Sequence, residues 1–175
     1  IFVFASSFLQ MGLFLFFEKW LFMSYSGVDF LLNSALLQGL FLLPYLFMLS
    51  PAANFSNIYP KEKVIAWSSL AIAITMISIA TCYSLGYQSI AFWQVLILAS
   101  AFAINSPAKY GVLKEMYGNQ YLTYANAYLQ GIAVFAIVCV SLLMMGISLD
   151  SESYFQLKYF PWLFVGMGII GTIAT

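Results

Sequence analysis

The chain has 175 residues, of which 63% are hydrophobic and only 7% are charged, whereas a soluble domain carries roughly a quarter of its residues as charged side chains. This composition excludes an ordinary water-soluble fold, and the balance of six lysines against six acidic residues offers no basic surface for nucleic acid. Histidine is absent, so histidine-based triads, histidine proton relays and the commonest transition-metal ligand are excluded, and we expect no catalytic residue, cofactor or metal site.

Six apolar runs are long enough to cross a bilayer as helices. About 20 apolar residues span the hydrocarbon core as a helix, and these runs lack the polar alternation of barrel strands. In chain order the predicted spans are residues 1–23, 30–50, 64–85, 90–106, 121–147 and 159–175. We therefore expect an all-α membrane protein. Because both ends lie inside apolar runs and no signal peptide is evident, we expect a segment of a longer polypeptide.

The first span carries two charged side chains at membrane depth. Glu18 and Lys19 are adjacent, but neighbours on a helix point about 100° apart, so they are not expected to pair with each other. Charges at this depth cost a few kcal/mol on insertion scales and usually face a cavity or a partner. If the helix begins before Ile1, the two residues lie at the outer interface instead. Both alternatives stay open from the sequence.

The connections between spans predict the orientation of the chain. Two long loops, residues 51–63 and 107–120, hold four of the six lysines, whereas the loops on the other side hold only Lys158. Cytoplasmic loops of membrane proteins are enriched in lysine and arginine. We therefore expect both lysine-rich loops and both ends of the chain in the cytoplasm, with the first, third and fifth spans running outward.

The second connection carries a pattern known from transporters. Residues 43–65, LPYLFMLSPAANFSNIYPKEKVI, resemble the signature between helices 2 and 3 of the major facilitator superfamily. In that family a Gly, an Asp four residues later and two basic residues lock the cytoplasmic gate. The resemblance assigns this gating loop to Ala53, Asn57, Lys61 and Lys63. Because a neutral Asn can accept a hydrogen bond or cap a helix but cannot make a charge-assisted bond, we expect a weaker or differently wired gate.

The end of the fourth span, INSPAKYGVLKEM, has two interpretations. Proline disfavours a helical residue before it, so the helix is predicted to end near Pro107. Lys109 then extends toward anionic headgroups at the cytoplasmic interface. Alternatively, Lys109 faces a central cavity, where its ammonium pairs with a lipid phosphate as a point charge. The residues alone leave both interpretations open.

The same stretch, continued through residue 131, resembles the junction of helices 4 and 5 in bacterial lysophospholipid transporters. Those proteins occur alone or fused to a lysophospholipid acyltransferase and acyl-ACP synthetase. The matching positions are Pro107, Lys109, Tyr110, Leu113, Leu122, Asn126 and Gln130. Gln130 replaces a Glu of the family pattern. It shares a helix face with Asn126 at i, i+4 spacing, where polar side chains either line a cavity or join helices.

The first span departs from the family pattern. The family carries an Asn- and Asp-rich patch there, whereas this chain has Gln10 at the comparable position. Either Gln10 is a neutral substitute for the acid, or Glu18 and Lys19 have taken over the polar role. The resemblance therefore implies a substrate-binding set consisting of Gln10, Glu18, Lys19, Lys109, Asn126 and Gln130.

The resemblance implies the amino-terminal six-helix bundle of a twelve-helix major facilitator. Such a protein lies in the bacterial inner membrane, has a carboxy-terminal transporter half and membrane lipids as partners, and works by alternating access. Its cargo would be a lysophospholipid. Three alternatives remain: a facilitator for another small solute, the membrane part of an acyltransferase whose chemistry lies elsewhere in a longer chain, and a non-transporting anchor or assembly subunit.

Overall fold

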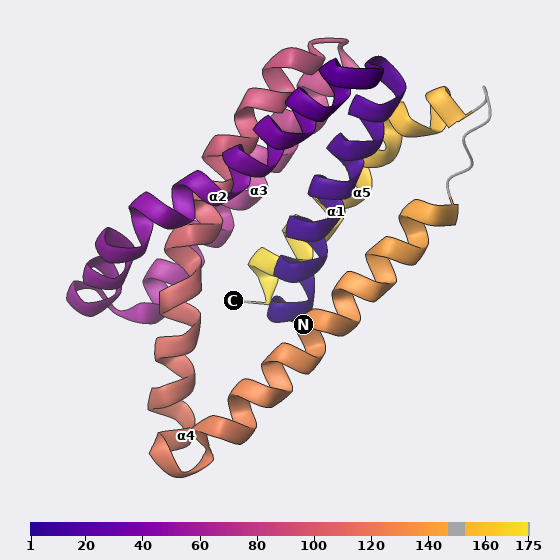
Figure 1. The fold of residues 1–175 in the computed structure, drawn as a ribbon. Helices are drawn as coiled ribbons and strands as arrows, with labels where there is room; N and C mark the ends of the chain where they lie inside the picture. Colours follow the sequence, from indigo (N-terminus) through magenta and orange to yellow (C-terminus); the bar gives the residue numbers. More distant parts are fainter. Residues whose placement is uncertain (147–152, 175) are drawn as a thin grey trace.

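The computed structural model describes residues 1–146 and 153–174, and this part of the chain is helical apart from short connections (Figure 1). The helices are α1 (Phe2–Ser24), α2 (Gly27–Ile58), α3 (Lys61–Ser84), α4 (Gln88–Gly146) and α5 (Ser153–Ile173). α4 is bent at Gly118, whose φ of 65° and ψ of 178° are not helical. A positive φ is readily adopted by glycine because it has no Cβ. The bend divides α4 into a first limb and a second limb.

Five helical segments of the described chain are long and apolar enough to cross a membrane. They are Phe2–Ser24, Gly27–Met48, Lys61–Ser84, Gln88–Gly118 and Gln120–Gly146. The apolar part of α5, Phe160–Ile173, is shorter. The prediction of an all-helical chain with membrane-spanning helices is therefore confirmed, while only five of the six predicted spans have full length. The predicted loop before the last span, residues 148–158, is helical from Ser153, and its first part lies outside the described residues.

Two of the predicted boundaries are wrong. α2 continues through Pro51 to Ile58, so most of the predicted loop 51–63 is helix. The first limb of α4 continues through Pro107 to Gly118, so the helix does not end at the proline. Ala108, which follows that proline, is fully buried and packs with Val64 and Ile65 of α3. A proline inside a membrane helix is tolerated where neighbouring helices support the freed backbone, and this packing supplies such support.

The core forms around α1, which lies between α5 and the two limbs of α4. Leu13, Phe16 and Phe17 of α1 are completely buried. The Phe16 ring packs edge-on against Tyr83 of α3, with ring centroids 4.9 Å apart, and against Phe164 of α5 at 6.4 Å. Aromatic rings bury large apolar areas and favour such edge-on contacts. The phenylalanines of α1 therefore hold three helices together.

A glycine allows α5 to approach α1 closely. A Cβ on Gly12 would lie 2.4 Å from Cε1 of Phe164 and 2.8 Å from Cγ2 of Val140. Both neighbours are fully buried, one on α5 and the other on the second limb of α4. Small residues allow membrane helices to pack at short distance, so Gly12 determines the spacing of this three-helix contact.

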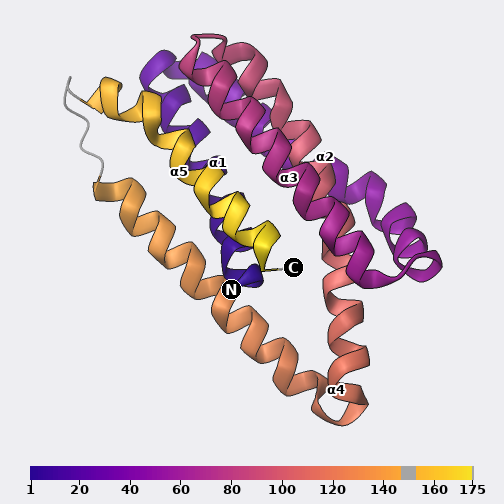
Figure 2. The ribbon, with the colours of Figure 1, turned by 180° about the vertical axis from the view of Figure 1, so that it is seen from behind.

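The helices run up and down so that the connections alternate between two ends. The α2–α3 connection and the bend of α4 lie at the same end, together with both ends of the described chain (Figures 1 and 2). The α1–α2 and α3–α4 connections lie at the other end. The two segments that hold Lys61, Lys63, Lys109 and Lys114 thus converge, as predicted, and we call this the lysine end.

Candidate functional site

Two hydrogen bonds between polar side chains connect helices; the one between α1 and α2 is partly buried, and the one between the two limbs of α4 is exposed. The amide of Gln10 on α1 donates from Nε2 to the hydroxyl oxygen of Tyr45 on α2, at 3.1 Å. The amide of Gln130 on the second limb of α4 donates to the hydroxyl oxygen of Tyr110 on the first limb, at 2.9 Å. We call these four residues the polar line; one pair connects α1 to α2, and the other connects the two limbs of α4 to each other.

The polar line adjoins a groove between α1, α2 and the second limb of α4. The groove has a volume of about 370 Å³, and its polar lining comes from Ser7, Gln10 and Gln38. The rest of its wall is apolar, with residues such as Phe14 and Phe41. Gln10 lies at the edge of the buried stripe of α1, since it is about 100° around the helix from Leu9 and about 60° from Leu13. The amide of Gln10 is therefore available both to Tyr45 and to the groove.

Lys109 and Asn126 lie on the same helical limbs as the second hydrogen-bonded pair. The ammonium of Lys109 is half-buried and lies 5.6 Å from the centroid of the Tyr110 ring, which is within cation–π range. Asn126 precedes Gln130 by one turn, and its buried Oδ1 has no hydrogen-bond partner among the described residues. A buried acceptor left unpaired costs free energy that a ligand donor can recover. A cation and an open acceptor are thus present beside the polar line.

Glu18 and Lys19 lie elsewhere, closer to the other end of the bundle. They are about 12 Å from Gln10 along the axis of α1, at 1.5 Å per residue. Oε2 of Glu18 accepts a hydrogen bond from Oγ of Ser34 on α2, at 2.8 Å. Nζ of Lys19 donates to the carbonyl oxygen of Met144 on the second limb of α4, at 3.4 Å. Each residue therefore contacts a different helix, and the structure does not bring either one to the polar line.

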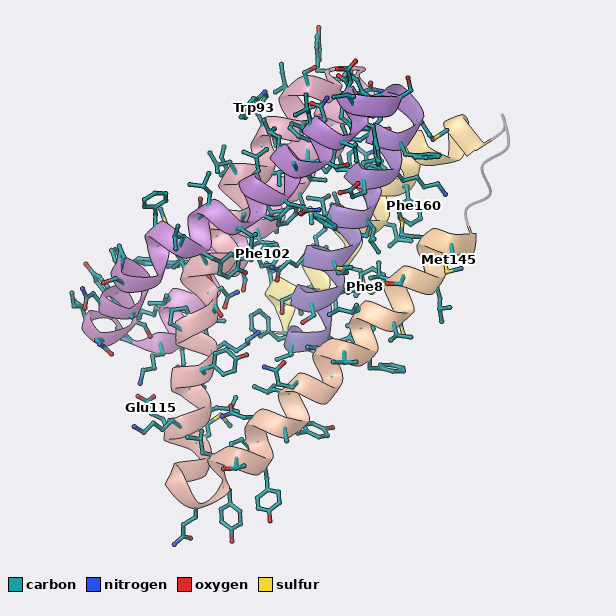
Figure 3. The ribbon with its side chains drawn as sticks, in the orientation of Figure 1. Phe8, Trp93, Phe102, Glu115, Met145 and Phe160 are labelled. Atoms are coloured by element: carbon teal, nitrogen blue, oxygen red, sulfur yellow. The ribbon has the colours of Figure 1, made fainter. Side chains whose placement is uncertain are left out.

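The residues assigned to the gate lie on helices rather than in a loop. Ala53 and Asn57 are exposed on the last turns of α2, and Lys61 and Lys63 stand in the first turn of α3. Lys61 forms an ion pair with Glu115 on the first limb of α4. Figure 3 shows Glu115 on the side of that limb that faces the α2–α3 connection.

A glycine makes room for this ion pair. The Lys61 side chain passes directly over Gly111, where a Cβ would lie 2.9 Å from both its Cδ and its Cε. Glu115 is exposed, so the electrostatic contribution of the pair to stability is small. Its structural effect is to direct Lys61 toward α4 of the same bundle. Lys63 carries no such contact among the described residues.

Sequence reasoning missed Tyr45, Ser34 and Glu115. Tyr45 lies in an apolar run directly after Pro44, and a tyrosine in the middle of a span was the available signal. Ser34 and Glu115 gave no distinguishing signal, because serine occurs throughout the spans and Glu115 follows Lys114 in a charged stretch. Partners of this kind emerge only from helix packing.

Comparisons with protein-family models, with curated proteins and with solved structures found no match for this chain.

Proposed function

We propose that this chain is the amino-terminal six-helix half of a major facilitator transporter that moves lysophospholipid across or between the leaflets of the bacterial inner membrane. The polar line is the observation that carries this proposal. One amide–hydroxyl hydrogen bond joins α1 to α2 and another joins the two limbs of α4, and all four residues belong to segments apolar enough to span a membrane. Polar side chains at membrane depth usually mark a substrate pathway, and carriers of this type bind their substrate between helices near the midplane.

The chemistry beside the polar line supports an amphiphilic cargo. Lys109 offers a compact positive charge for a phosphate, and Asn126 offers an open acceptor for a headgroup donor. The groove beside Gln10 combines amides with a mainly apolar wall, as a headgroup joined to an acyl chain requires. This combination favours a lysophospholipid over a small hydrophilic solute, because a hydrophilic solute has no acyl chain to pack against the apolar wall.

The distribution of lysines supports one orientation for this carrier. The segments that hold Lys61, Lys63, Lys109 and Lys114 lie at the lysine end (Figure 1) and are joined there by the Lys61–Glu115 ion pair. The positive-inside rule therefore assigns that end to the cytoplasm. In the proposed carrier a carboxy-terminal half completes the site from the opposite side. Lys61 and Lys63 remain the proposed basic gate positions. Because Asn57 is neutral, we expect the gate to use another acidic partner, and Glu115 is the acidic residue that pairs with Lys61.

Uptake of a labelled lysophospholipid by proteoliposomes of the full-length protein tests the proposal. Lys109→Ala should slow uptake by roughly 10- to 150-fold, since a hydrogen bond to a charged group contributes about 1.5–3 kcal/mol. Lys114→Ala is the matched control, because Lys114 is an exposed lysine at the same end of the same limb. Both variants should reach the membrane in normal amounts.

Two results would overturn this function. Uptake by the Lys109→Ala variant at the unchanged rate would leave Lys109 as an interface anchor only. Proteoliposomes of the unmodified protein that take up no lysophospholipid would remove the cargo assignment altogether.

A further inference from the structure

A second groove lies at the lysine end, between α2, α3 and the first limb of α4. Its volume is about 370 Å³, and its walls are mainly apolar. Its lining includes Phe55, Tyr59, Lys63, Trp67, Ala71 and Ile104. We call this the α3 groove, after the helix that supplies its longest wall and lies toward the viewer in Figure 2. It shares no residue with the polar line or with the groove beside Gln10.

One positive charge lies at the mouth of the α3 groove. Lys63 is exposed and has no ion-pair partner within the described residues, whereas Lys61, two positions earlier, is paired with Glu115. The N-cap residue of α3, Pro60, makes no side-chain capping bond. The first turn of α3 also carries Glu62, which is exposed and does not line the groove, while the amino-terminal end of the helix keeps a partial positive charge. The mouth of the groove is therefore suited to an anionic group.

From this mouth the groove runs into the membrane-spanning part of the bundle. Lys63 and Ala71 are about 12 Å apart along α3, at 1.5 Å per residue, and both belong to the candidate span Lys61–Ser84. Trp67 lies between them and is 63% exposed, which leaves its indole open to the surroundings. The Tyr59 ring lies beside it, with centroids 6.5 Å apart. Tryptophan and tyrosine are enriched at the level of lipid headgroups.

We propose that the α3 groove holds an anionic membrane phospholipid, with its phosphate on Lys63 and one acyl chain lying along Trp67 and Ala71. A cation at the interface above an apolar trough matches the two parts of such a lipid, since basic residues next to a membrane attract anionic headgroups. This lipid is a resident of the bundle surface; it uses Lys63, which is also a proposed gate position, but its binding does not require that the chain transports lysophospholipid.

Quenching of tryptophan fluorescence by brominated lipids tests the site. The full-length protein, with Trp93 and Trp162 replaced by Phe, retains Trp67 as an exposed indole and Trp20 as a buried one. It is reconstituted in phosphatidylcholine, and brominated phosphatidylglycerol or brominated phosphatidylcholine is titrated in. We expect phosphatidylglycerol to quench at about fivefold lower mole fraction, which corresponds to one lysine near the membrane surface.

Two pairs of variants separate the charge from the groove. Lys63→Gln should abolish the preference for phosphatidylglycerol, whereas Lys114→Gln, an exposed lysine outside the groove, should keep it. Ala71→Phe should fill the groove and weaken quenching by both lipids, whereas Ala66→Phe, also exposed on α3, should not. All four positions are on the surface or at the mouth, so the variants are expected to fold.

The proposal fails if Lys63→Gln retains the full preference, or if both lysine variants lose it equally, because general surface charge would then explain it. It also fails if the fluorescence of the Ala71→Phe variant is quenched by the brominated lipids as strongly as that of the Ala66→Phe variant, because no acyl chain would then occupy the groove.

Discussion

Single polar residues in this chain find their partners on other helices. Gln10 bonds to Tyr45, Gln130 to Tyr110 across the bend of α4, and Glu18 accepts from Ser34. In hydrocarbon a polar group without a partner costs several kcal/mol, which favours such pairing, although the buried Oδ1 of Asn126 has no partner among the described residues. The sequence identifies Gln10 as a candidate because it is a polar residue within an apolar run. It does not identify the partner, which lies 35 residues away for Gln10.

The Gln10–Tyr45 bond can be measured by a double-mutant cycle. Gln10→Leu and Tyr45→Phe should each destabilise the protein, and their effects should be coupled by about 0.6 kcal/mol, as is usual for hydrogen bonds between membrane helices. The free energy of unfolding in mixed detergent micelles provides the measurement. Tyr124→Phe is the control partner, because Tyr124 is 76% exposed and its effect should add to that of Gln10→Leu within about 0.3–0.5 kcal/mol. Additive effects for Gln10 and Tyr45 would refute the bond.

Whole helices depart from the sequence prediction where packing overrides a local signal. Pro51 of α2 and Pro107 of α4 led us to predict loops, yet both helices continue through them, and Ala108 beyond Pro107 packs against α3. The break that does occur is at Gly118, seven residues after Gly111 in a stretch with several turn-forming residues. Local propensity marks possible breaks, while contacts between helices select the one that forms.

Gly12 provides a test at the level of helix packing. Gly12→Ala should lower the free energy of unfolding by about 1–3 kcal/mol, the usual cost of overpacking a core. Its Cβ would overlap the ring of Phe164, which is completely buried and packed against Phe8, Phe16 and Phe160. Because the Phe164 ring is packed on several sides, moving it away from the new Cβ would cost free energy. Thermal unfolding in detergent measures the effect.

Gly131→Ala is the matched control for that variant. Gly131 is also helical, but no atom lies within 4 Å of its Cβ position. Alanine is the better helix former by about 1 kcal/mol, so this variant should be unchanged or slightly stabilised. If Gly12→Ala were equally stable, the close contact between α1 and α5 would be refuted.

The whole molecule is an up-and-down bundle whose lysine-bearing segments meet at one end. The ion pair between Lys61 and Glu115 connects the start of α3 directly to the first limb of α4 near its bend. The positive-inside rule depends only on which residues share a side of the membrane, so the arrangement of this end underlies the orientation proposed for the carrier.

Cysteine labelling tests the arrangement of the ends. In full-length protein with Cys82 and Cys139 replaced by Ser, single cysteines are placed at Asn57, Lys114 and Tyr87, which are all exposed. A membrane-impermeant maleimide added to one side of sealed vesicles should label Asn57→Cys and Lys114→Cys together. Tyr87→Cys, in the α3–α4 connection, should be labelled only from the opposite side. Labelling of Asn57→Cys and Lys114→Cys from different sides would contradict the bundle.

The sequence by itself determined that the chain is helical and apolar enough for a membrane, and that the two segments holding four of its six lysines share one end. Those properties depend on composition and on the spacing of apolar runs, which act locally along the chain. Only the tertiary structure decided that Pro51 and Pro107 remain inside helices and that Tyr45 and Tyr110 meet the amides. These outcomes depend on contacts between residues far apart in the chain, and no pattern within a single span encodes them.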